Sequence, residues 1–561
     1  MRRYGSLWDP RLVPLFAMLA VTLCGLPAAW NSHWMWIDDQ IVVGSKLWPP
    51  DSDFNISSHM QGRESIGQGL YFKLLSFVLP LQPSWYYLAN YAVHVCAIGL
   101  AALLVWQTTR AGVATAFCIL TAGLASTGPE VFLTLFKQEL PMTLWVLVAL
   151  LLVLHLMRPD PSRRRGTLVA LATATFLSGT LGKENFVVLP LGVTAGLVCA
   201  AWIAPRSRLA GRLLAALLFT LIGTVAVFVE RYLVGTRSIA EGTYTGKLFD
   251  FHPTLAASIE RAKIYVFHAG DAIVLAAVAA VACAACVAAA IYRKRDLTAS
   301  HVVAITCAAA AVTQVVFNVF FLKFVQVYYL YPVAVLATVA LACLWPAASE
   351  NIGAAAGLAR WMRFCRVGLA TILLGIAVLT LPTFALRIYA QNVIPASEWR
   401  LMNAMADLPP NSLVLLGFPP EAEMIENSAL LLDRVLGRGD ITIEAAFSPS
   451  NEARLSEAYA ERRPVYLAFV YEPGENVKVG IRGVTQYSRP ENLALAANYG
   501  IGRICPGPRE TVGPWPFRVS RVYPSLPPII TIRFGYGWEV DRVIPPSTSY
   551  SACEPVLYSD R

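Results

Sequence analysis

Long apolar stretches separated by short polar segments fill the first 386 residues of the chain. Several of these stretches reach about 18 residues, the length at which an α-helix crosses the hydrocarbon core of a bilayer. No small-x-small cleavage site follows the first stretch, so we interpret it as an uncleaved helix and not as a signal peptide. We predict about eleven transmembrane helices, at residues 12–30, 85–106, 111–127, 142–157, 167–182, 186–204, 213–232, 264–292, 302–322, 328–345 and 367–386.

The distribution of charged residues predicts on which side of the membrane each loop lies. Hydrophobic residues make up 56% of the chain and charged residues only 14%, whereas a soluble domain carries about a quarter charged residues. The net charge of +9 is concentrated in loops between the apolar stretches. The basic clusters are Arg163–Arg165, Arg206 with Arg208 and Arg212, Arg293–Arg295, and Arg360 with Arg363 and Arg366. Short loops rich in Lys and Arg stay in the cytoplasm, so we attribute the charge to membrane topology and not to nucleic-acid binding.

Alternation of the spans places all of these basic loops on one side. The N-terminus is then cytoplasmic, and residues 31–84 form the first extracytoplasmic loop. The Ala- and Arg-rich composition and the compact loops are typical of bacteria. We therefore predict a multi-pass protein of the bacterial inner membrane, with residues 1–386 in the membrane and residues 387–561 in the periplasm.

The last part of the chain, residues 387–561, has frequent prolines and charges of both signs. Short apolar or alternating segments bounded by turn residues predict strands at 412–418, 440–446, 464–471 and 529–534. Helical patterns cover residues 397–408 and 421–436. The sequence as a whole therefore predicts a mostly α, polytopic transmembrane helix bundle followed by a small soluble α/β domain.

Cysteine usage agrees with this division. Nine of the eleven cysteines lie in or beside apolar spans, where Cys behaves as a small hydrophobe. Cys505 and Cys553 lie in the periplasmic part, and an oxidising compartment favours a disulfide between them. No Cys/His spacing predicts a zinc site. No Gly-rich phosphate-binding loop is present in the sequence, which argues against a nucleotide-driven enzyme or pump.

The sharpest candidate for chemistry is the acidic pair Asp38–Asp39, just beyond the first predicted helix. Two adjacent carboxylates at a membrane surface can bind a divalent cation, act as a base or cap a helix. The capping interpretation stays open, because an Asp before Gln40–Val43 is a sensible N-cap. No cofactor is required by the sequence, although the pair leaves room for a divalent cation.

Further polar residues are expected on the same outer side of the bundle. They are Arg63 and Glu64 in the first loop, Asn90 and His94 on one helix face, Lys137–Glu139, Lys183–Asn185, Arg231 with Arg237, Lys323 and Tyr328–Pro332. Any one of them could be an interfacial anchor. Ionisable residues at membrane depth are costly and usually functional, so their convergence on one side favours a site.

In this order the elements resemble the GT-C superfamily of integral-membrane glycosyltransferases, in particular the branch that uses polyprenol-phosphate sugars, as protein mannosyltransferases do. The resemblance covers residues 12–345. It rests on Asp38–Asp39, Arg63–Tyr71, Tyr87–His94, Gly182–Asn185 with Pro190, and Tyr329–Pro332. Relatives often carry an Arg just before the last motif, where this chain has Val327 and Tyr328.

The resemblance implies an inverting transfer of a sugar from a polyprenyl phosphate to an acceptor hydroxyl. Such a reaction needs a base for the hydroxyl proton and cations for the departing phosphate. Asp38 is the expected base, with Asp39 in support and Glu139 as a second acid. The donor phosphate is assigned to Lys183, Arg231 and Lys323, and further substrate contacts to Arg63, Glu64, His94, Glu184 and Tyr328.

Two other functions stay open from the sequence. An O-antigen polymerase or ligase also uses lipid-linked sugars, but such enzymes carry their main large loop late in the chain. A lipid-linked-sugar transporter or flippase would have many helices and intramembrane charges, and internal repeats would favour it, but we detect none. The transferred sugar cannot be read from the sequence, and the acceptor could be a surface glycan, lipid A or a protein.

Overall fold

The computed structural model describes residues 12–34, 74–135, 137–158, 164–181, 188–203, 209–239, 252–292, 297–322, 325–345, 375, 380–381, 383–385, 387–389, 391–392, 395–417, 422–446, 451–471, 503–505, 509–512, 519–523, 526–532 and 536–544. The chain divides into two compact units. The first comprises Met1–Trp30 and Asp51–Ile388, and the second comprises Asn31–Pro50 and Tyr389–Arg561. The catalytic and periplasmic roles expected for the two parts stay predictions.

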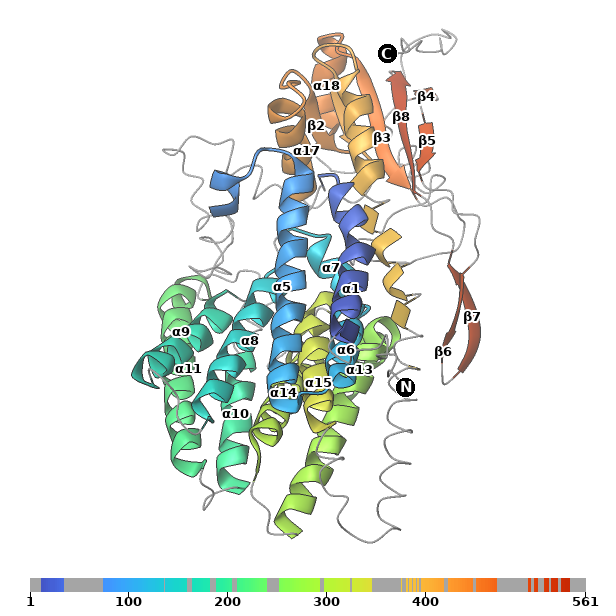
Figure 1. The fold of residues 1–561 in the computed structure, drawn as a ribbon. Helices are drawn as coiled ribbons and strands as arrows, with labels where there is room; N and C mark the ends of the chain where they lie inside the picture. Colours follow the sequence, from blue (N-terminus) through green and yellow to red (C-terminus); the bar gives the residue numbers. More distant parts are fainter. Residues whose placement is uncertain are drawn as a thin grey trace. The chain divides into compact units, whose positions relative to one another are not determined.

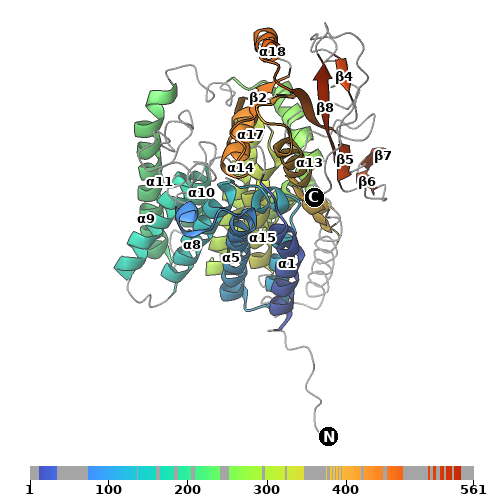
Figure 2. The same cartoon turned by 90° about the horizontal axis from the view of Figure 1, so that it is seen from above.

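The first unit is a helix bundle. Its helices are α1 (Leu12–Trp30), α5 (Pro83–Thr109), α6 (Gly112–Gly123), α7 (Gly128–Phe132), α8 (Glu139–Leu156), α9 (Arg164–Thr180), α10 (Val188–Ile203), α11 (Ala210–Ile239), α13 (Leu255–Tyr292), α14 (Ala299–Phe321), the short 3-10 helix η2 (Val327–Leu330) and α15 (Tyr331–Leu344). Within the bundle α5 packs against α8 and α10 packs against α14, and α9 and α11 adjoin at one edge in both Figure 1 and Figure 2.

Ten of the predicted spans are therefore confirmed as helices within the described residues. Seven helical segments there are long and apolar enough to cross a membrane, whereas α6 and α10 are apolar but shorter. The eleventh predicted span, 367–386, falls mostly outside the described residues, and its described positions are helical. The protein is thus a multi-pass integral membrane protein, as the apolar pattern predicts.

The bundle has a buried central helix and outer helices with exposed apolar side chains, as expected for a protein surrounded by lipid. Every residue of α15 is buried, so this helix forms the interior of the bundle. The outer helices instead expose apolar side chains, for example Leu15 at 65% and Phe16 at 64% on α1. Soluble proteins cover such faces, but lipid chains solvate them without penalty.

Small residues let α10 and α14 approach each other closely. A Cβ added at Gly192 would lie 2.6 Å from the Cα of Ala310, and one at Gly196 would lie 2.5 Å from the Cα of Thr306. Neither space can hold a side chain, because the obstacle in each case is backbone. Close backbone approach through small residues is a common way for helices to associate in membranes, where the hydrophobic effect does not drive them together.

The second unit contains a six-stranded sheet in the order β2–β1–β3–β8–β4, with β5 also pairing with β8. Its strands are β1 (Leu413–Leu416), β2 (Thr442–Ala445), β3 (Val465–Tyr471), β4 (Arg503–Cys505), β5 (Arg509–Val512) and β8 (Tyr536–Ile544), and β6 (Val519–Tyr523) pairs with β7 (Leu526–Ile532) in a separate hairpin. The helices α17 (Ala422–Arg434) and α18 (Asn451–Ala460) connect β1 to β2 and β2 to β3, and these three strands are parallel.

Several sequence-based predictions for this unit are confirmed. The expected strands at 412–418, 440–446, 464–471 and 529–534 correspond to β1, β2, β3 and β7. The expected helices correspond to helical residues 395–406 and to α17. The helix α18 and the strands β4, β5, β6 and β8 were not predicted from the sequence. Among these, β8 carries Glu539, Asp541 and Arg542 between its apolar residues and lies against β3, β4 and β5, so its pairing partners and not its composition make it a strand.

Cys505, in β4, is buried and disulfide-bonded. The other eight described cysteines are free, and Cys553 lies outside the described residues. The pairing with Cys553 stays a prediction.

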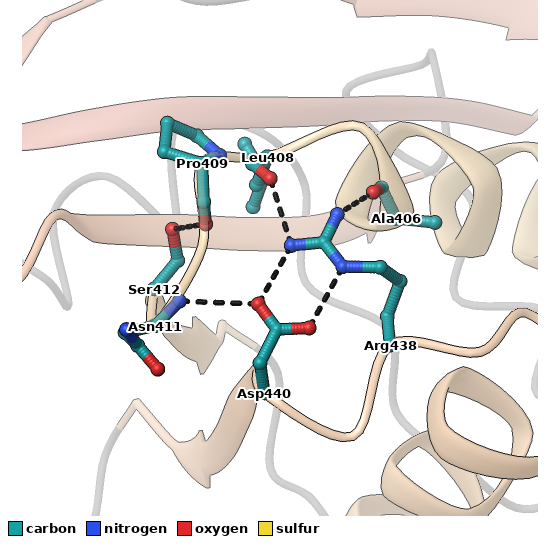
Figure 3. Close-up of polar contacts among 7 residues, drawn as sticks. All are labelled: Ala406, Leu408, Pro409, Asn411, Ser412, Arg438 and Asp440. Carbon is teal, nitrogen blue, oxygen red and sulfur yellow. Dashed lines mark hydrogen bonds and ion pairs between the residues drawn. The ribbon is translucent and has the colours of Figure 1, made fainter.

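Arg438 ties three segments of the second unit together (Figure 3). Its guanidinium donates to both carboxylate oxygens of Asp440, at 2.8 and 2.9 Å, to the carbonyl of Leu408 at 2.9 Å, and to the carbonyl of Ala406. The Asp440 carboxylate also accepts the backbone N–H of Asn411 at 3.1 Å. The carbonyls at the end of the 395–406 helix, which have no partner within that helix, are thereby satisfied. The hydrogen bonds from Arg438 lower the pKa of Asp440 well below its ordinary value.

We expect Arg438→Ala to destabilise this region by about 1–3 kcal/mol, because it leaves two carbonyls and a carboxylate without their donor. Hydrogen exchange of the full-length protein should show faster exchange in peptides from 401–417. The matched control is Arg434→Ala, since Arg434 is half exposed and pairs with its sequence neighbour Asp433, and we expect less than about 0.5 kcal/mol there. Equal protection in wild type and Arg438→Ala would contradict the assignment.

The same contact has a defined pH dependence. A carboxyl whose pKa is lowered by folding stabilises the folded state above its unfolded pKa of about 3.9, and this contribution is lost as pH falls through the folded pKa. Protection of 401–417 should therefore be unchanged between pH 7 and pH 5 and should weaken only below about pH 4.

Candidate functional site

Many predicted site residues lie outside the described residues. These are Asp38, Asp39, Arg63, Glu64, Lys183, Glu184, Lys323 and Cys553. Arg231 lies in α11, but its side chain is outside the description as well. The roles assigned to them stay predictions, and the structure places His94, Glu139 and Tyr328.

The connection between α6 and α8, residues 124–138, holds the most informative polar groups. It contains only the five-residue helix α7, yet residues 125–135 and 137–140 are all buried. The sequence places the end of this segment on the outer side of the bundle, where the chain re-enters the membrane, and this placement stays a prediction. The structure shows that the segment is enclosed by protein. Irregular backbone within a membrane bundle needs partners from the protein for its N–H and C=O groups, so this segment is held by specific contacts with other helices.

The end of this connection presents three consecutive polar residues, Lys137, Gln138 and Glu139. Their exposed fractions are 8%, 1% and 0%. The Lys137 ammonium lies 4.3 Å from the ring centroid of Tyr328. This is a cation–π contact with the segment Tyr328–Pro332, called here the tyrosine-rich turn. Glu139 is the first residue of α8, where the N-terminal end of the helix dipole favours a carboxylate. A cation and an acid two residues apart in the chain are thus both buried in the bundle.

Asn90 and His94 lie on one face of α5, as their spacing predicts. Asn90 donates to the carbonyl of Thr134 at 3.2 Å, which ties α5 to the α6–α8 connection. His94 Nδ1 lies 2.8 Å from the Tyr331 hydroxyl, and Nε2 lies 3.3 Å from the carbonyl of Gly123. A carbonyl only accepts, so Nε2 carries the proton and Tyr331 donates to Nδ1 in the neutral ring. His94 is therefore held by protein groups on both sides.

Further charged residues that were not predicted from the sequence have protein partners inside the bundle. Glu130, in α7, pairs with Arg387 at 2.6 Å, and Asp271 of α13 accepts two hydrogen bonds from Ser126. Arg261 donates to the carbonyls of Phe320 and Leu322 at the end of α14. Single charged residues within apolar stretches were the signal that could have indicated Glu130 and Asp271, but their partners are distant in sequence.

The segment that leads from α1 toward the acidic pair is partly described. Trp34 is 2% exposed. Partial burial, and to a smaller extent the charge of Arg400, lower the pKa of His33 below its ordinary value, so His33 is neutral at pH 7. Among the described residues, no three His, Cys, Asp or Glu side chains are grouped so as to hold a metal ion.

These features define a class: a polytopic membrane protein with an α/β unit at its C-terminus and a buried cluster of charged and aromatic side chains in its helix bundle. Neither a protein-family model nor a curated protein matches the chain. Solved structures are similar to it. ArnT from Cupriavidus metallidurans in the apo state matches with a TM-score of 0.46 and 14% identity, over 96% of this chain and 99% of that chain. The same protein bound to undecaprenyl phosphate matches with a TM-score of 0.44 and 15% identity, over 81% and 92%.

Proposed function

We propose that this protein is an inverting membrane glycosyltransferase that moves a sugar from a polyprenyl-phosphate donor to an acceptor hydroxyl on the extracytoplasmic side. The observation that carries the proposal is the buried Lys137–Glu139 segment, which lies against the tyrosine-rich turn and is tied to the Asn90/His94 face of α5. Two elements of the resemblance, Tyr87–His94 and Tyr329–Pro332, thus meet each other through the His94–Tyr331 contact, and the Lys137–Glu139 segment adjoins them. A buried acid and a buried cation in one segment suit a reaction that takes up a proton and releases a phosphate.

In the proposed reaction, Asp38 removes the proton from the acceptor hydroxyl, with Asp39 supporting it by a hydrogen bond. The acceptor oxygen forms a bond to the anomeric carbon from the face opposite the phosphate, and the bond from that carbon to the phosphate oxygen breaks. Glu139 orients the acceptor or the base. Lys183, Arg231 and Lys323 neutralise the departing polyprenyl phosphate.

Arg63, Glu64, Glu184 and Tyr328 are proposed to contact the substrates. His94 is proposed to contribute through Tyr331, because both of its ring nitrogens have protein partners. A lipid of the class bound to ArnT, undecaprenyl phosphate, is the proposed carrier. The acceptor is a glycan, a lipid such as lipid A, or a protein.

The proposal is tested with purified protein in lipid nanodiscs and a panel of polyprenyl-phosphate sugars. The measurements are release of polyprenyl phosphate and formation of a glycosylated product, with the anomeric configuration of the product determined by NMR. Inversion is the expected result, and added EDTA tests for a divalent cation. Retention of configuration, or no release from any donor, would rule the proposal out.

Gln138 is a buried polar residue whose side-chain amide is not satisfied by hydrogen bonds within the described residues. Neither its amide nitrogen nor its amide oxygen has a hydrogen-bond partner among the described residues, at 1% exposure. An unsatisfied buried amide costs about 1–3 kcal/mol, so a substrate hydroxyl is a suitable partner. We expect Gln138→Leu to lower kcat/KM about three- to tenfold while leaving thermal stability equal or higher.

The matched control for this variant is Gln314→Leu. Gln314 is also fully buried, but its amide nitrogen donates to Asn318 at 2.9 Å, so this change should lower stability and spare kcat/KM. A Gln138→Leu protein that loses stability and keeps wild-type kcat/KM would show that Gln138 is structural.

The site also requires a defined membrane orientation. We expect single cysteines introduced at Arg163 and Arg293 to react only with permeant thiol reagents in intact cells, because basic loops stay in the cytoplasm. Cysteines placed after Arg387 should react with impermeant reagents. Native cysteines labelled in the parent protein provide the background. Labelling of the tail only after permeabilisation would refute both the orientation and the extracytoplasmic site.

A further inference from the structure

Polar contacts with three other parts of the bundle hold the α6–α8 connection. The backbone N–H and the hydroxyl of Ser126 donate to the two carboxylate oxygens of Asp271, at 2.8 and 2.5 Å. Glu130 pairs with Arg387 at 2.6 Å. Asn90 donates to the carbonyl of Thr134. One contact comes from α13, one from the segment that ends the bundle, and one from α5, so the connection is fixed along its length before it reaches Glu139.

A kink in α13 makes the contact of Arg387 possible. Ala269 has non-helical dihedral angles, φ −140° and ψ 42°, and an interruption of this kind frees carbonyls from the helix ladder. The carbonyl of His268, next to the kink, accepts a hydrogen bond from Arg387. The Arg387 guanidinium therefore joins the kinked helix and Glu130 at one point.

The Glu130–Arg387 pair is nearly dry, with side-chain exposed fractions of 9% and 13%. A buried ion pair contributes little net stability, because desolvation opposes the attraction, but it selects one geometry over others. Aromatic packing provides a second set of contacts to α7. Phe132 has ring centroids 4.9 Å from Tyr91, 5.0 Å from His94 and 6.3 Å from Phe384. The ion pair and the packing of Phe132 thus both hold α7, which lies shortly before Lys137 and Glu139 in the chain.

We propose that Glu130 and Arg387 are positioning residues, which act on the transfer reaction by fixing Lys137 and Glu139 against the tyrosine-rich turn. This inference rests on the proposed glycosyltransferase function. Small displacements of a reacting group from its productive geometry cost roughly 100-fold in rate. Neither residue touches the substrates in this proposal, so their loss affects the rate of reaction and not donor binding.

The test compares Glu130→Gln, Arg387→Gln and the double variant in the full-length protein. We expect each to lower kcat about 10- to 100-fold, with the donor KM within about threefold, and the double variant to lose no more than either single one. In a Glu139→Gln background, Glu130→Gln should cost less than it does in the wild-type protein, because part of its effect acts through the Glu139 carboxylate. A fully additive loss, or wild-type kcat in either single variant, would overturn the proposal.

The matched control is the exposed pair Glu260–Lys263 on α13, with N···O at 2.6 Å and side chains 66% exposed. The double change to Gln there should leave kcat and KM unchanged. If the Gln variants fail to insert, Glu130→Asp and Arg387→Lys keep both charges and shift only the geometry. They should fold and lose about tenfold in kcat, and an unchanged kcat in both would equally overturn the proposal.

Hydrogen exchange separates this inference from the proposed function. In Glu130→Gln and Arg387→Gln, peptides from 126–138 should exchange faster while α10 and α14 stay protected. If the wild-type protein transfers no sugar, the function is wrong, and the exchange result still decides whether the pair anchors the connection. Unchanged exchange at 126–138 would show that the pair does not.

Discussion

Asp38→Asn is expected to insert and fold normally and to lose roughly two to four orders of magnitude in turnover. The substitution keeps the size and most of the hydrogen-bonding capacity of the side chain while removing its basicity. Asp38 follows the first membrane helix closely in sequence, and the sugar–phosphate bond of a lipid donor must lie near the membrane surface. The measurement is the single-turnover rate with a saturating polyprenyl-phosphate sugar.

Asp39→Asn provides the matched control, because it changes the adjacent carboxylate in the same way. We expect a smaller loss of turnover. If Asp39 only caps a helix, its replacement should cost about 1 kcal/mol of stability and leave the rate intact. Wild-type turnover in Asp38→Asn together with an inactive Asp39→Asn would move the base by one residue. Full activity in both variants would make the pair structural and remove the main support for a glycosyltransferase.

Lys183→Ala is expected to weaken the use of the donor by about 10- to 150-fold, which corresponds to one charge-assisted contact of about 1.5–3 kcal/mol. The loss should appear in the donor KM and in binding of free polyprenyl phosphate, because the lysine contacts the phosphate before and after transfer. Arg231→Ala and Lys323→Ala should give losses of the same kind if they share the phosphate.

The control is Lys294→Ala, which removes a lysine from a loop predicted to lie in the cytoplasm. We expect no change in donor KM there. Unchanged donor binding in all three test variants would place the phosphate elsewhere. Lys137 would then be the first alternative, since its ammonium is nearly buried and lies over the Tyr328 ring.

Part of the candidate site could be predicted because it depends on spacing within one helix. Asn90 and His94 are four residues apart, so any α-helix places them on one face, and both are buried there. Their partners could not be predicted. Thr134 belongs to an irregular segment, and Tyr331 lies 237 residues beyond His94 in the chain.

The membrane spans follow from the sequence alone, because the length and apolarity of a stretch are local properties that decide whether it can cross a bilayer. The strands β1 and β3 could be recognised from their apolar side chains, and β2 from its alternating pattern between turn residues. The burial of the α6–α8 connection and the kink of α13 at Ala269 depend on how the helices pack, so they are seen only in the folded structure. Glu130 and Arg387 are 257 residues apart, and a buried charge is tolerated only where folding brings its partner to it.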